Sequence, residues 1–502
     1  MSLSQINTRA RLGMDAPIVS VETHLSNGLP SLAIVGLPET AVRESKERVR
    51  SALMNSGFEF PNRRVTINLA PADLPKQGGR YDLAIALGVL GATGQLDGAD
   101  TDSFEFIGEL ALNGMLRPIP GALSCALASS QADRALILPA DNASEAALCE
   151  STRVFGARHL TDVVQHLLGT SSLPQVKLKT EPFSGSSSVP DLSDVRGQYQ
   201  ARRALEVAAA GGHNLLFYGP PGTGKSMLAS RLPGILPKLT HQQAVDVASI
   251  YSLAGKPRAG SSLYLPPYRC PHHTSSPVAL VGGGSHPSPG EISLAHRGVL
   301  FLDELPEFGR HVLEVLREPI ESGEIHISRA STTLTFPAAF QLLAAMNPCP
   351  CGYSGHPKIP CIDTPQQIAN YRKKLSGPLL DRFDLHIEVN FQEGAAILGK
   401  GAPGESSVVV AKRVAQARAT QMDRQNSLNS ELTTPMIDRF CAMNNETLRC
   451  LEQAMDTLAL SARGAHRIIR VARTLADLAQ DVSITRQHIV EAIAYRGMAR
   501  QS

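Results

Sequence analysis

Short apolar runs that end at a glycine, an acid or an asparagine mark the middle of the chain. Leu215–Tyr218 precedes a glycine, Gly298–Leu302 precedes two acids, and Phe340–Met346 precedes an asparagine. Uninterrupted apolar runs of this kind are typical of buried parallel strands. The stretch Ser226–Leu232, just behind the first run, has the pattern of a helix. We therefore predict an α/β domain over residues 191–392.

A different order of elements precedes this domain. Residues 1–170 contain strands and helices without regular alternation, which is an α+β pattern. The predicted strands are Ile18–Thr23, Ser31–Val35, Val65–Leu69 and Ala135–Pro139, with a hairpin over Phe104–Gly121. The predicted helices are Glu39–Asn55, Leu83–Leu90 and Ala122–Ser130. Residues 171–190 are rich in Ser, Pro and Lys, a linker composition.

Helices dominate the end of the chain. Residues 393–408 are rich in Gly, Ala, Pro and Ser and form a second predicted linker, and residues 409–502 form a helical domain. The predicted helices are Val409–Gln425, Met436–Ala442, Glu446–Leu458, Ser461–Ala479 and Thr485–Ala499. We expect Ser461 and Thr485 to be the N-caps of the last two.

Composition narrows the classes of protein. Hydrophobic residues make up 43% and charged residues 19% of the 502 residues, so ordinary globular cores are expected. The net charge is only +2, so any binding of nucleic acid must come from local basic features. Eight cysteines in a chain of this length do not make a disulfide scaffold. We find no signal peptide and no membrane-spanning run, and expect a cytoplasmic protein.

A glycine-rich loop between the first apolar strand and the following helix has the composition of a phosphate-binding loop. Strand, glycine loop and helix are the context that this motif requires, because glycines let backbone N–H groups turn toward phosphate oxygens. Lys225 is expected to reach the terminal phosphates of a nucleotide, and the Ser226 hydroxyl to ligate magnesium. The loop consists of Gly219, Pro220, Pro221, Gly222, Thr223, Gly224, Lys225 and Ser226.

Polar residues follow the two later strands. Because the carboxyl ends of parallel strands meet the phosphates, we expect Asp303 to hold magnesium and Glu304 to orient and polarise the attacking water. Asn347 is expected to lie between the two acids and help to place that water. The alternative for Asn347 is a capping role in a strand-to-loop turn.

Several longer stretches of the central domain resemble the signature of magnesium-chelatase-type AAA+ ATPases. They are Tyr268–Thr274, Val281–Gly284, Pro289–His296, Ala345–Gly352 and Leu379–Asp384. The resemblance implies a P-loop core with a C-terminal helical lid, ATP and Mg²⁺ as cofactors, and a homo-hexameric ring.

The resemblance also implies roles for arginines. Arg382 would reach the γ-phosphate bound by the neighbouring subunit, unless it only forms an ion pair with an aspartate. Arg463, or else Arg467, would contact the γ-phosphate bound by its own chain. Val195, Gly197 and Gln198 are weaker candidates for contacts with adenine.

Residues 1–170 resemble the proteolytic domain of Lon-type proteases, which has a ribosomal-S5-like fold. The nearest similarity is Gly108–Gly121. That family uses a serine and a lysine, but Lys76–Asp82 contains no serine and Gly121–Cys125 contains no lysine. We therefore expect a non-catalytic domain for assembly or partner binding.

Two inserts of the central domain, Val281–His296 and Glu321–Ala330, match inserts that enter the ring pore in the related MCM helicases. Arg329 stands where those proteins carry a basic residue that touches DNA. The second insert is expected to be a hairpin that turns at Ser322-Gly323 or at Arg329. If Arg329 does not bind DNA, the basic helix from Lys412 to Arg424 is the next candidate.

The order of the three domains is similar to a family of bacterial competence proteins. It implies a DNA helicase that drives branch migration during natural transformation, with single-stranded or branched DNA and recombination proteins as partners. The alternative is a metal-insertion ATPase subunit of the chelatase type. A protease is disfavoured by the missing serine and lysine, and a scaffold by the full set of hydrolytic residues.

Cys349, Cys351 and Cys361 form the one cluster of cysteines in the sequence. Three thiols at this spacing suit a zinc site, although packing cysteines are the alternative. The fourth ligand is open between His356, Asp363 and Cys270.

Overall fold

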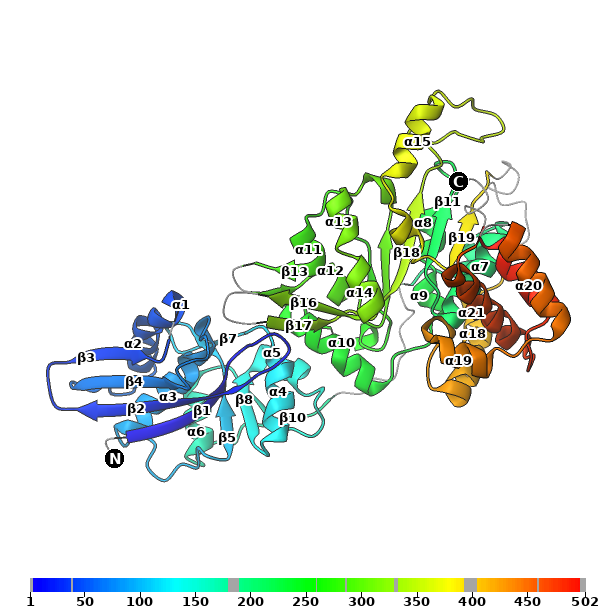
Figure 1. Ribbon diagram of the computed structural model, residues 1–502. Helices are drawn as coiled ribbons and strands as arrows, with labels where there is room; N and C mark the ends of the chain where they lie inside the picture. The colour runs from blue at the N-terminus through cyan, green and yellow to red at the C-terminus, as the bar shows by residue number, and fades with distance from the viewer. Residues whose placement is uncertain are drawn as a thin grey trace.

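The computed structural model describes residues 3–37, 39–178, 189–258, 260–284, 287–328, 333–391, 404–457 and 460–496. Figure 1 shows an elongated molecule with an N-terminal unit at one end, a parallel sheet in the middle and a group of helices at the other end. None of the helices in the described ranges combines the length and apolar character that crossing a membrane requires.

The N-terminal unit contains two four-stranded sheets. The first has the order β1 (Leu3–Arg9), β2 (Ile18–Ser26), β4 (Arg64–Ala70), β3 (Ser31–Val35), and the second β10 (Gln175–Val176), β9 (Val154–Ala157), β8 (Ala135–Pro139), β5 (Phe104–Phe106). A small hairpin joins β6 (Glu109–Leu110) to β7 (Leu116–Arg117). The helices are α1 (Thr40–Arg43), α2 (Ser45–Asn55), α3 (Asp82–Ala92), α4 (Ala122–Gln131), α5 (Ala140–Ala146) and α6 (Leu160–Leu167).

All strands predicted for this unit are confirmed, and the helix expected over Glu39–Asn55 is divided into α1 and α2. Strand β1 is not predicted, because its residues alternate weakly in polarity. It forms by pairing antiparallel with β2, and Arg9 at its end makes a buried ion pair with Glu105 at 2.6 Å. Tertiary contacts therefore stabilise a strand that the local pattern does not indicate.

The central sheet is parallel throughout. Its order is β12 (Tyr268–Arg269), β15 (Val299–Leu302), β18 (Gln341–Met346), β11 (Leu215–Tyr218), β19 (Leu385–Glu388). The helices around it are α7 (Tyr199–Gly211), α8 (Lys225–Ala229), α9 (Leu232–Ile235), α10 (His241–Leu253), α11 (Pro277–Val281), α12 (Glu291–Leu294), α13 (Arg310–Glu314), α14 (Arg317–Ser322), α15 (Pro365–Lys373) and α16 (Gly377–Leu380). The three predicted apolar strands are confirmed as its buried centre, so all the polar residues that follow them share one edge.

Both inserts form hairpins. The first pairs β13 (Gly282–Gly283) with β14 (Ser288–Pro289), and the second pairs β16 (Glu324–Ser328) with β17 (Thr333–Pro337). They lie together, since a Cβ on Gly282 would come within 3.4 Å of the Ile327 side chain. Of the two turns considered for the second hairpin, Ser322-Gly323 ends α14 instead. The other candidate, Arg329, lies outside the described residues, which end at Ser328 and resume at Thr333.

The N-terminal unit is packed against the central one. Leu123 of α4 and Val245 of α10 belong to one buried apolar cluster, and the Gly121 amide donates to the carbonyl of Ser252 at 3.0 Å. The turn at Gly13 also reaches the second hairpin: a Cβ there would lie 3.3 Å from Leu334 Cδ2. The N-terminal unit thus supports both α10 and β17 of the central unit.

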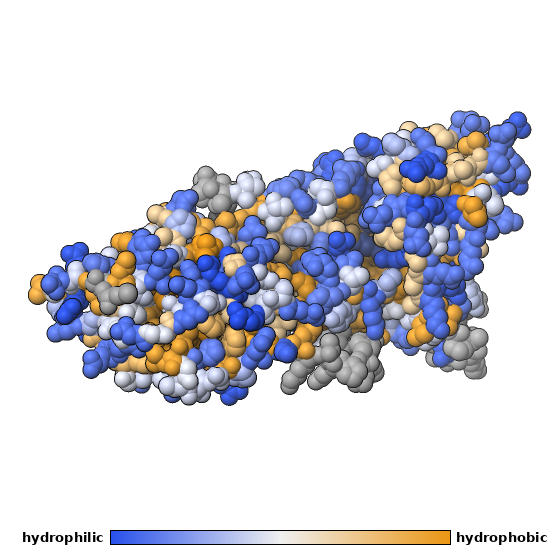
Figure 2. Space-filling view, turned by 90° about the horizontal axis from the view of Figure 1, so that it is seen from below, coloured by the Kyte–Doolittle hydropathy of each residue, from blue (hydrophilic) through white to orange (hydrophobic). Residues whose placement is uncertain are grey.

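Large apolar side chains remain exposed on the N-terminal unit. Figure 2, which views the molecule from below, shows apolar patches over its left part. The most exposed large apolar residues of this unit are Leu3, Leu29, Leu37, Met54, Leu112 and Met115. Scattered exposed apolar residues are ordinary, but this number on one unit favours a surface that other molecules cover.

The C-terminal helices are α18 (Ser407–Gln425), α19 (Thr434–Phe440), α20 (Asn445–Thr457), α21 (Ala462–Ala479) and α22 (Arg486–Ala494). The predicted cap at Ser461 is confirmed, because its hydroxyl accepts a hydrogen bond from the Gly464 amide at 3.2 Å.

The arginines of helix α18, the second candidate for DNA binding, are engaged with other residues of the chain. Arg413 pairs with Glu206 and Glu405, Arg418 donates to the carbonyl of Ala209, and Arg424 pairs with Asp477 at 2.6 Å. These arginines hold α18 to its neighbours because a buried guanidinium requires acceptors. Of the basic residues Lys412, Arg413, Arg418 and Arg424 on this helix, Lys412 alone is exposed.

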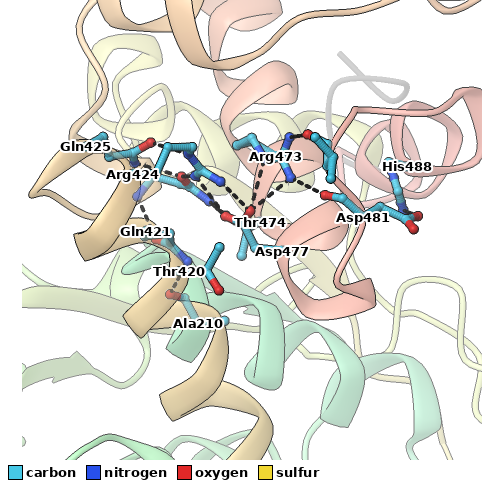
Figure 3. A network of polar contacts seen from close by, with 12 residues as sticks. Ala210, Thr420, Gln421, Arg424, Gln425, Arg473, Thr474, Asp477, Asp481 and His488 are labelled. Carbon is cyan, nitrogen blue, oxygen red and sulfur yellow. Dashed lines mark hydrogen bonds and ion pairs between the residues drawn. The ribbon is translucent and has the colours of Figure 1, made fainter.

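Asp477 is the centre of a buried polar network, shown in Figure 3. Its carboxylate accepts hydrogen bonds from Arg424, Arg473 and Asn429, and the side chains of Arg473 and Asp477 are 2% and 0% exposed.

Replacing Asp477 with alanine would leave the buried guanidinium of Arg473 and the partly buried guanidinium of Arg424 without their carboxylate. We expect a loss of about 3–5 kcal/mol in the free energy of unfolding of these helices, measured by urea denaturation with hydrogen exchange in α21. Asp481→Ala is the control: its carboxylate is half-exposed and lies 3.5 Å from His488, so we expect a loss below about 1 kcal/mol. Equal losses in the two variants would contradict the central role of Asp477.

Candidate nucleotide site

The loop between β11 and α8 adopts a conformation that requires glycine. Gly219, Gly222 and Gly224 have φ angles of +155°, +74° and +89°. A Cβ on Gly219 would also lie 2.2 Å from the carbonyl oxygen of Val389. The predicted order of strand, glycine loop and helix is therefore present, and the loop ends where α8 begins, at Lys225.

Lys225 lies inside this loop and is 8% exposed. Its ammonium group donates to the carbonyls of Gly219 and Pro220 at 2.7 and 2.8 Å, and to Asn347 Oδ1 at 3.1 Å. Burial lowers the pKa of Lys225 to about 8, against the opposing effect of Asp303 and Glu304. A phosphate group in the loop would favour the charged form of this lysine.

Ser226 and Asp303 are brought together from two separate elements. The Ser226 hydroxyl donates to Asp303 Oδ2 at 2.6 Å, and Asp303 Oδ1 accepts from the Glu304 amide at 2.9 Å. Hydroxyl and carboxylate oxygens are the ligands that Mg²⁺ prefers, so the donor set fits this ion.

Glu304 has a left-handed backbone conformation, with φ +53°, and its side chain is 53% exposed. Its carboxylate oxygen Oε2 lies 3.2 Å from His273 Nδ1. Backbone strain of this kind at a non-glycine residue is typical of functional sites. The sequence does not single out His273, because only the pairing of β12 with β15 brings it to Glu304.

Asn347 follows β18, and its Oδ1 accepts a hydrogen bond from Lys225 at the loop. Its expected place between the two acids stays a prediction. Of the three candidates for adenine contacts, Gln198 reaches the loop directly: its side chain donates to the carbonyls of Thr223 and Asn390 at 3.3 and 2.8 Å. Gly197 has φ +62° beside it, and Val195 is buried.

Arg382 lies at the opposite edge of the sheet. It precedes β19, and its carbonyl accepts from Asn214, which precedes β11. The Arg382 guanidinium pairs with Glu321 at 2.6 Å, not with an aspartate. Arg382 and Glu321 line a hollow of about 510 Å³. Lys225 follows β11, whereas Arg382 precedes β19, which pairs parallel with β11. The two residues therefore lie at opposite ends of neighbouring strands and do not meet in one chain.

Helix α21, which carries Arg463, contacts the segment that follows Arg382. Arg463 is exposed on the first turn of α21, one turn before Arg467, whose guanidinium donates to the carbonyl of Phe383 at 3.5 Å. Further along, α21 packs on the end of α7, where Thr474 contacts His213 at 2.7 Å. The expectation that Arg463 and Lys225 act from one chain stays a prediction.

The cysteine cluster lies close to the nucleotide loop. The sulfurs of Cys349, Cys351 and Cys361 are 3.4 to 3.7 Å apart, and the Asp363 carboxylate joins them within 4.8 Å.

A parallel sheet in this order, with a phosphate loop after one strand and two acids after another, defines a P-loop protein of the AAA+ class. Three family models match the chain: "Magnesium chelatase, subunit ChlI" over residues 191–397, "Subunit ChlI of Mg-chelatase" over residues 21–142, and "Magnesium chelatase, subunit ChlI C-terminal" over residues 404–496. The family suggests ATPase activity with ATP and Mg²⁺.

Full-length relatives narrow the family further. The chain is 50% identical to the competence protein ComM of Haemophilus influenzae, over 100% of this chain and 98% of that protein. It is also 50% identical to the protein YifB of Escherichia coli, with the same coverage. A magnesium-chelatase 38 kDa subunit of Acidiphilium rubrum is 26% identical over 58% of this chain and 85% of its own length. The chain belongs to the ComM/YifB family of magnesium-chelatase-like AAA+ proteins.

Proposed function

We propose that this protein hydrolyses ATP at sites shared between neighbouring copies in a homo-hexameric ring and uses the energy to move DNA. The single observation that carries the proposal is the separation of two half-sites. Lys225, Ser226, Asp303 and Glu304 gather at one edge of the sheet, and Arg382 lies at the other.

Each residue of the first half-site has a task that follows from its position. The buried ammonium of Lys225 neutralises the terminal phosphates, and the glycine loop donates backbone N–H groups to them. Ser226 and Asp303 would hold Mg²⁺, and the bound ion would supply Lewis-acid stabilisation of charge on the phosphate oxygens. Glu304 takes up the proton of the attacking water, and Asn347 helps to orient that water.

The second half-site comes from the neighbouring copy. Arg382 reaches the γ-phosphate there and stabilises the charge that develops on it. Arg463, on the first turn of α21, would contact the γ-phosphate bound by its own chain.

The division of the chain follows from these roles. We propose a non-catalytic Lon-like domain over residues 1–170, a linker over 171–190, the AAA+ core over 191–392, a linker over 393–408 and a helical lid over 409–502. The exposed apolar side chains of the first unit support its use in assembly or partner binding.

DNA is the proposed substrate of the motor. The two inserts lie side by side, and a basic residue at the turn of the second, Arg329, would meet phosphates without reading bases. The name of the relative ComM supports a role in competence. We propose a helicase that drives branch migration of donor DNA during natural transformation. It would act in the cytoplasm on single-stranded or branched DNA, together with recombination proteins.

Arg329→Ala tests this substrate. Removing one arginine–phosphate interaction should reduce the slope of log affinity against log salt by about one unit, while nucleotide binding and assembly stay intact. Fluorescence anisotropy of labelled DNA at several salt concentrations, with an unwinding assay, measures this. Arg449→Ala is the control, since Arg449 lies on α20, far from the hairpins. A variant that binds and unwinds DNA like the parent would remove Arg329 from the DNA path.

A metal-insertion ATPase of the chelatase type is the second candidate, favoured by the family models and by the 26% identity to a chelatase subunit. It predicts an ATPase rate that does not respond to DNA. ATP hydrolysis measured with and without branched DNA therefore separates the two functions.

A further inference from the structure

The cysteine cluster has the geometry of a closed metal site. A four-coordinate zinc ion with Zn–S bonds of about 2.3 Å places its sulfurs about 3.8 Å apart. The three sulfur–sulfur distances here are 3.4, 3.5 and 3.7 Å. Three thiolates and one carboxylate select zinc over Mg²⁺, which prefers oxygen alone.

Among the three candidates for the fourth ligand, Asp363 is the one whose carboxylate lies beside the three sulfurs. Asp363 Oδ2 accepts a hydrogen bond from the Cys351 amide at 2.8 Å, which holds the carboxylate toward the sulfurs. His356 uses Nδ1 to accept from the amides of Lys358 and Ile359 at 3.1 and 2.9 Å. Among the described residues, Cys270 does not belong to the group of donors that lie within reach of one another.

The segment that carries these cysteines lies in contact with the phosphate loop. The segment starts directly after Asn347, and Gly352, within it, lies against the phosphate loop. A Cβ on Gly352, which has φ +85°, would lie 2.8 Å from Pro221 Cδ and 3.9 Å from Asn347 Cγ. Cys349, three residues before Gly352, is fully buried.

We propose that a zinc ion bound by Cys349, Cys351, Cys361 and Asp363 braces the phosphate loop, so that its loss weakens nucleotide binding. The ion closes the chain from Cys349 to Cys361 into a loop and thereby fixes Gly352 against Pro221. The effect of zinc on nucleotide binding depends on the proposed function of the ATP site, whereas the metal site itself does not. A displacement of the loop by about 1 Å is enough to cost ~10²-fold in catalysis.

Zinc content is the first measurement. Full-length protein purified without chelators is expected to contain one zinc per chain by elemental analysis. Cys361→Ser and Asp363→Asn should each lower this content, and Cys450→Ser, a half-buried cysteine on α20, should not. A parent protein without zinc, or variants that keep it fully, would overturn the metal site.

The brace has its own measurement. Zinc-depleted parent protein and Cys361→Ser should bind a fluorescent ATP analogue about 10-fold more weakly or worse, and zinc added back should restore the parent but not the variant. Gly352→Ala should keep zinc and still bind the analogue weakly, which separates the brace from a folding defect. Unchanged affinity in depleted protein that remains folded by circular dichroism would overturn the brace. A parent that carries zinc but hydrolyses no ATP would refute the proposed function and leave the metal site standing.

Discussion

Replacing Glu304 with glutamine is expected to slow ATP turnover at least ~100-fold, the usual loss on removal of a general base. The amide keeps the shape of the side chain and cannot take up a proton from water. The hydrogen bonds of Lys225, Ser226 and Asp303 do not involve the Glu304 side chain, so binding of ATP and ring assembly should persist. Steady-state ATP hydrolysis beside titration with a fluorescent analogue measures both quantities.

Glu307→Gln is the matched control for this substitution. Glu307 lies three residues further on, is 44% exposed and forms a surface ion pair with Lys374 at 3.4 Å. Such pairs contribute little, so turnover should stay near that of the parent. Near-normal hydrolysis by Glu304→Gln itself would refute the assignment of this residue.

The second large effect is expected at Arg382. Arginines that reach a neighbour's γ-phosphate contribute about 10³–10⁵-fold to the rate, so Arg382→Ala should bind nucleotide and hydrolyse it very slowly. Subunits with Lys225→Ala should be inactive for the opposite reason, since they lack the phosphate-binding ammonium. A mixture of these two inactive variants should recover part of the activity, because some interfaces then pair an intact Lys225 with an intact Arg382.

The mixing experiment contains its own control. Arg382→Ala mixed with the double variant Lys225→Ala/Arg382→Ala offers no intact arginine at any interface and should stay inactive. If no ratio of the two single variants recovers activity, Arg382 does not act between subunits. The ion pair of Arg382 with Glu321 would then be its whole function.

The phosphate loop and the two acids behind it could be predicted from the sequence because their signals are local. Three signals are neighbours along the chain here: an apolar strand, a loop with glycines of positive φ, and a helix. Gly219–Ser226 forms the loop between β11 and the start of α8. The same locality explains why the strand before Asp303 and the helix cap at Ser461 could be predicted correctly.

Contacts between distant segments were decided only by the tertiary structure. The sheet order places β12 beside β15 and so brings His273 to Glu304, although nothing in the sequence near His273 specifies a carboxylate partner. Strand β1 exists because β2 pairs with it. The sequence predicts a basic helix here, but only the tertiary structure shows that its arginines pair with the acids and carbonyls of neighbouring segments.

The sequence by itself determined which chemical groups are present: a lysine in a glycine loop, acids after an apolar strand, three clustered thiols. The tertiary structure alone decided which of them can act together. It separates Arg382 from Lys225 along the strands of the sheet and brings Asp363 to the thiols. The physical reason is that a strand fixes its own residues through local preferences, whereas its neighbours in the sheet are fixed by the burial of apolar surface over the whole domain.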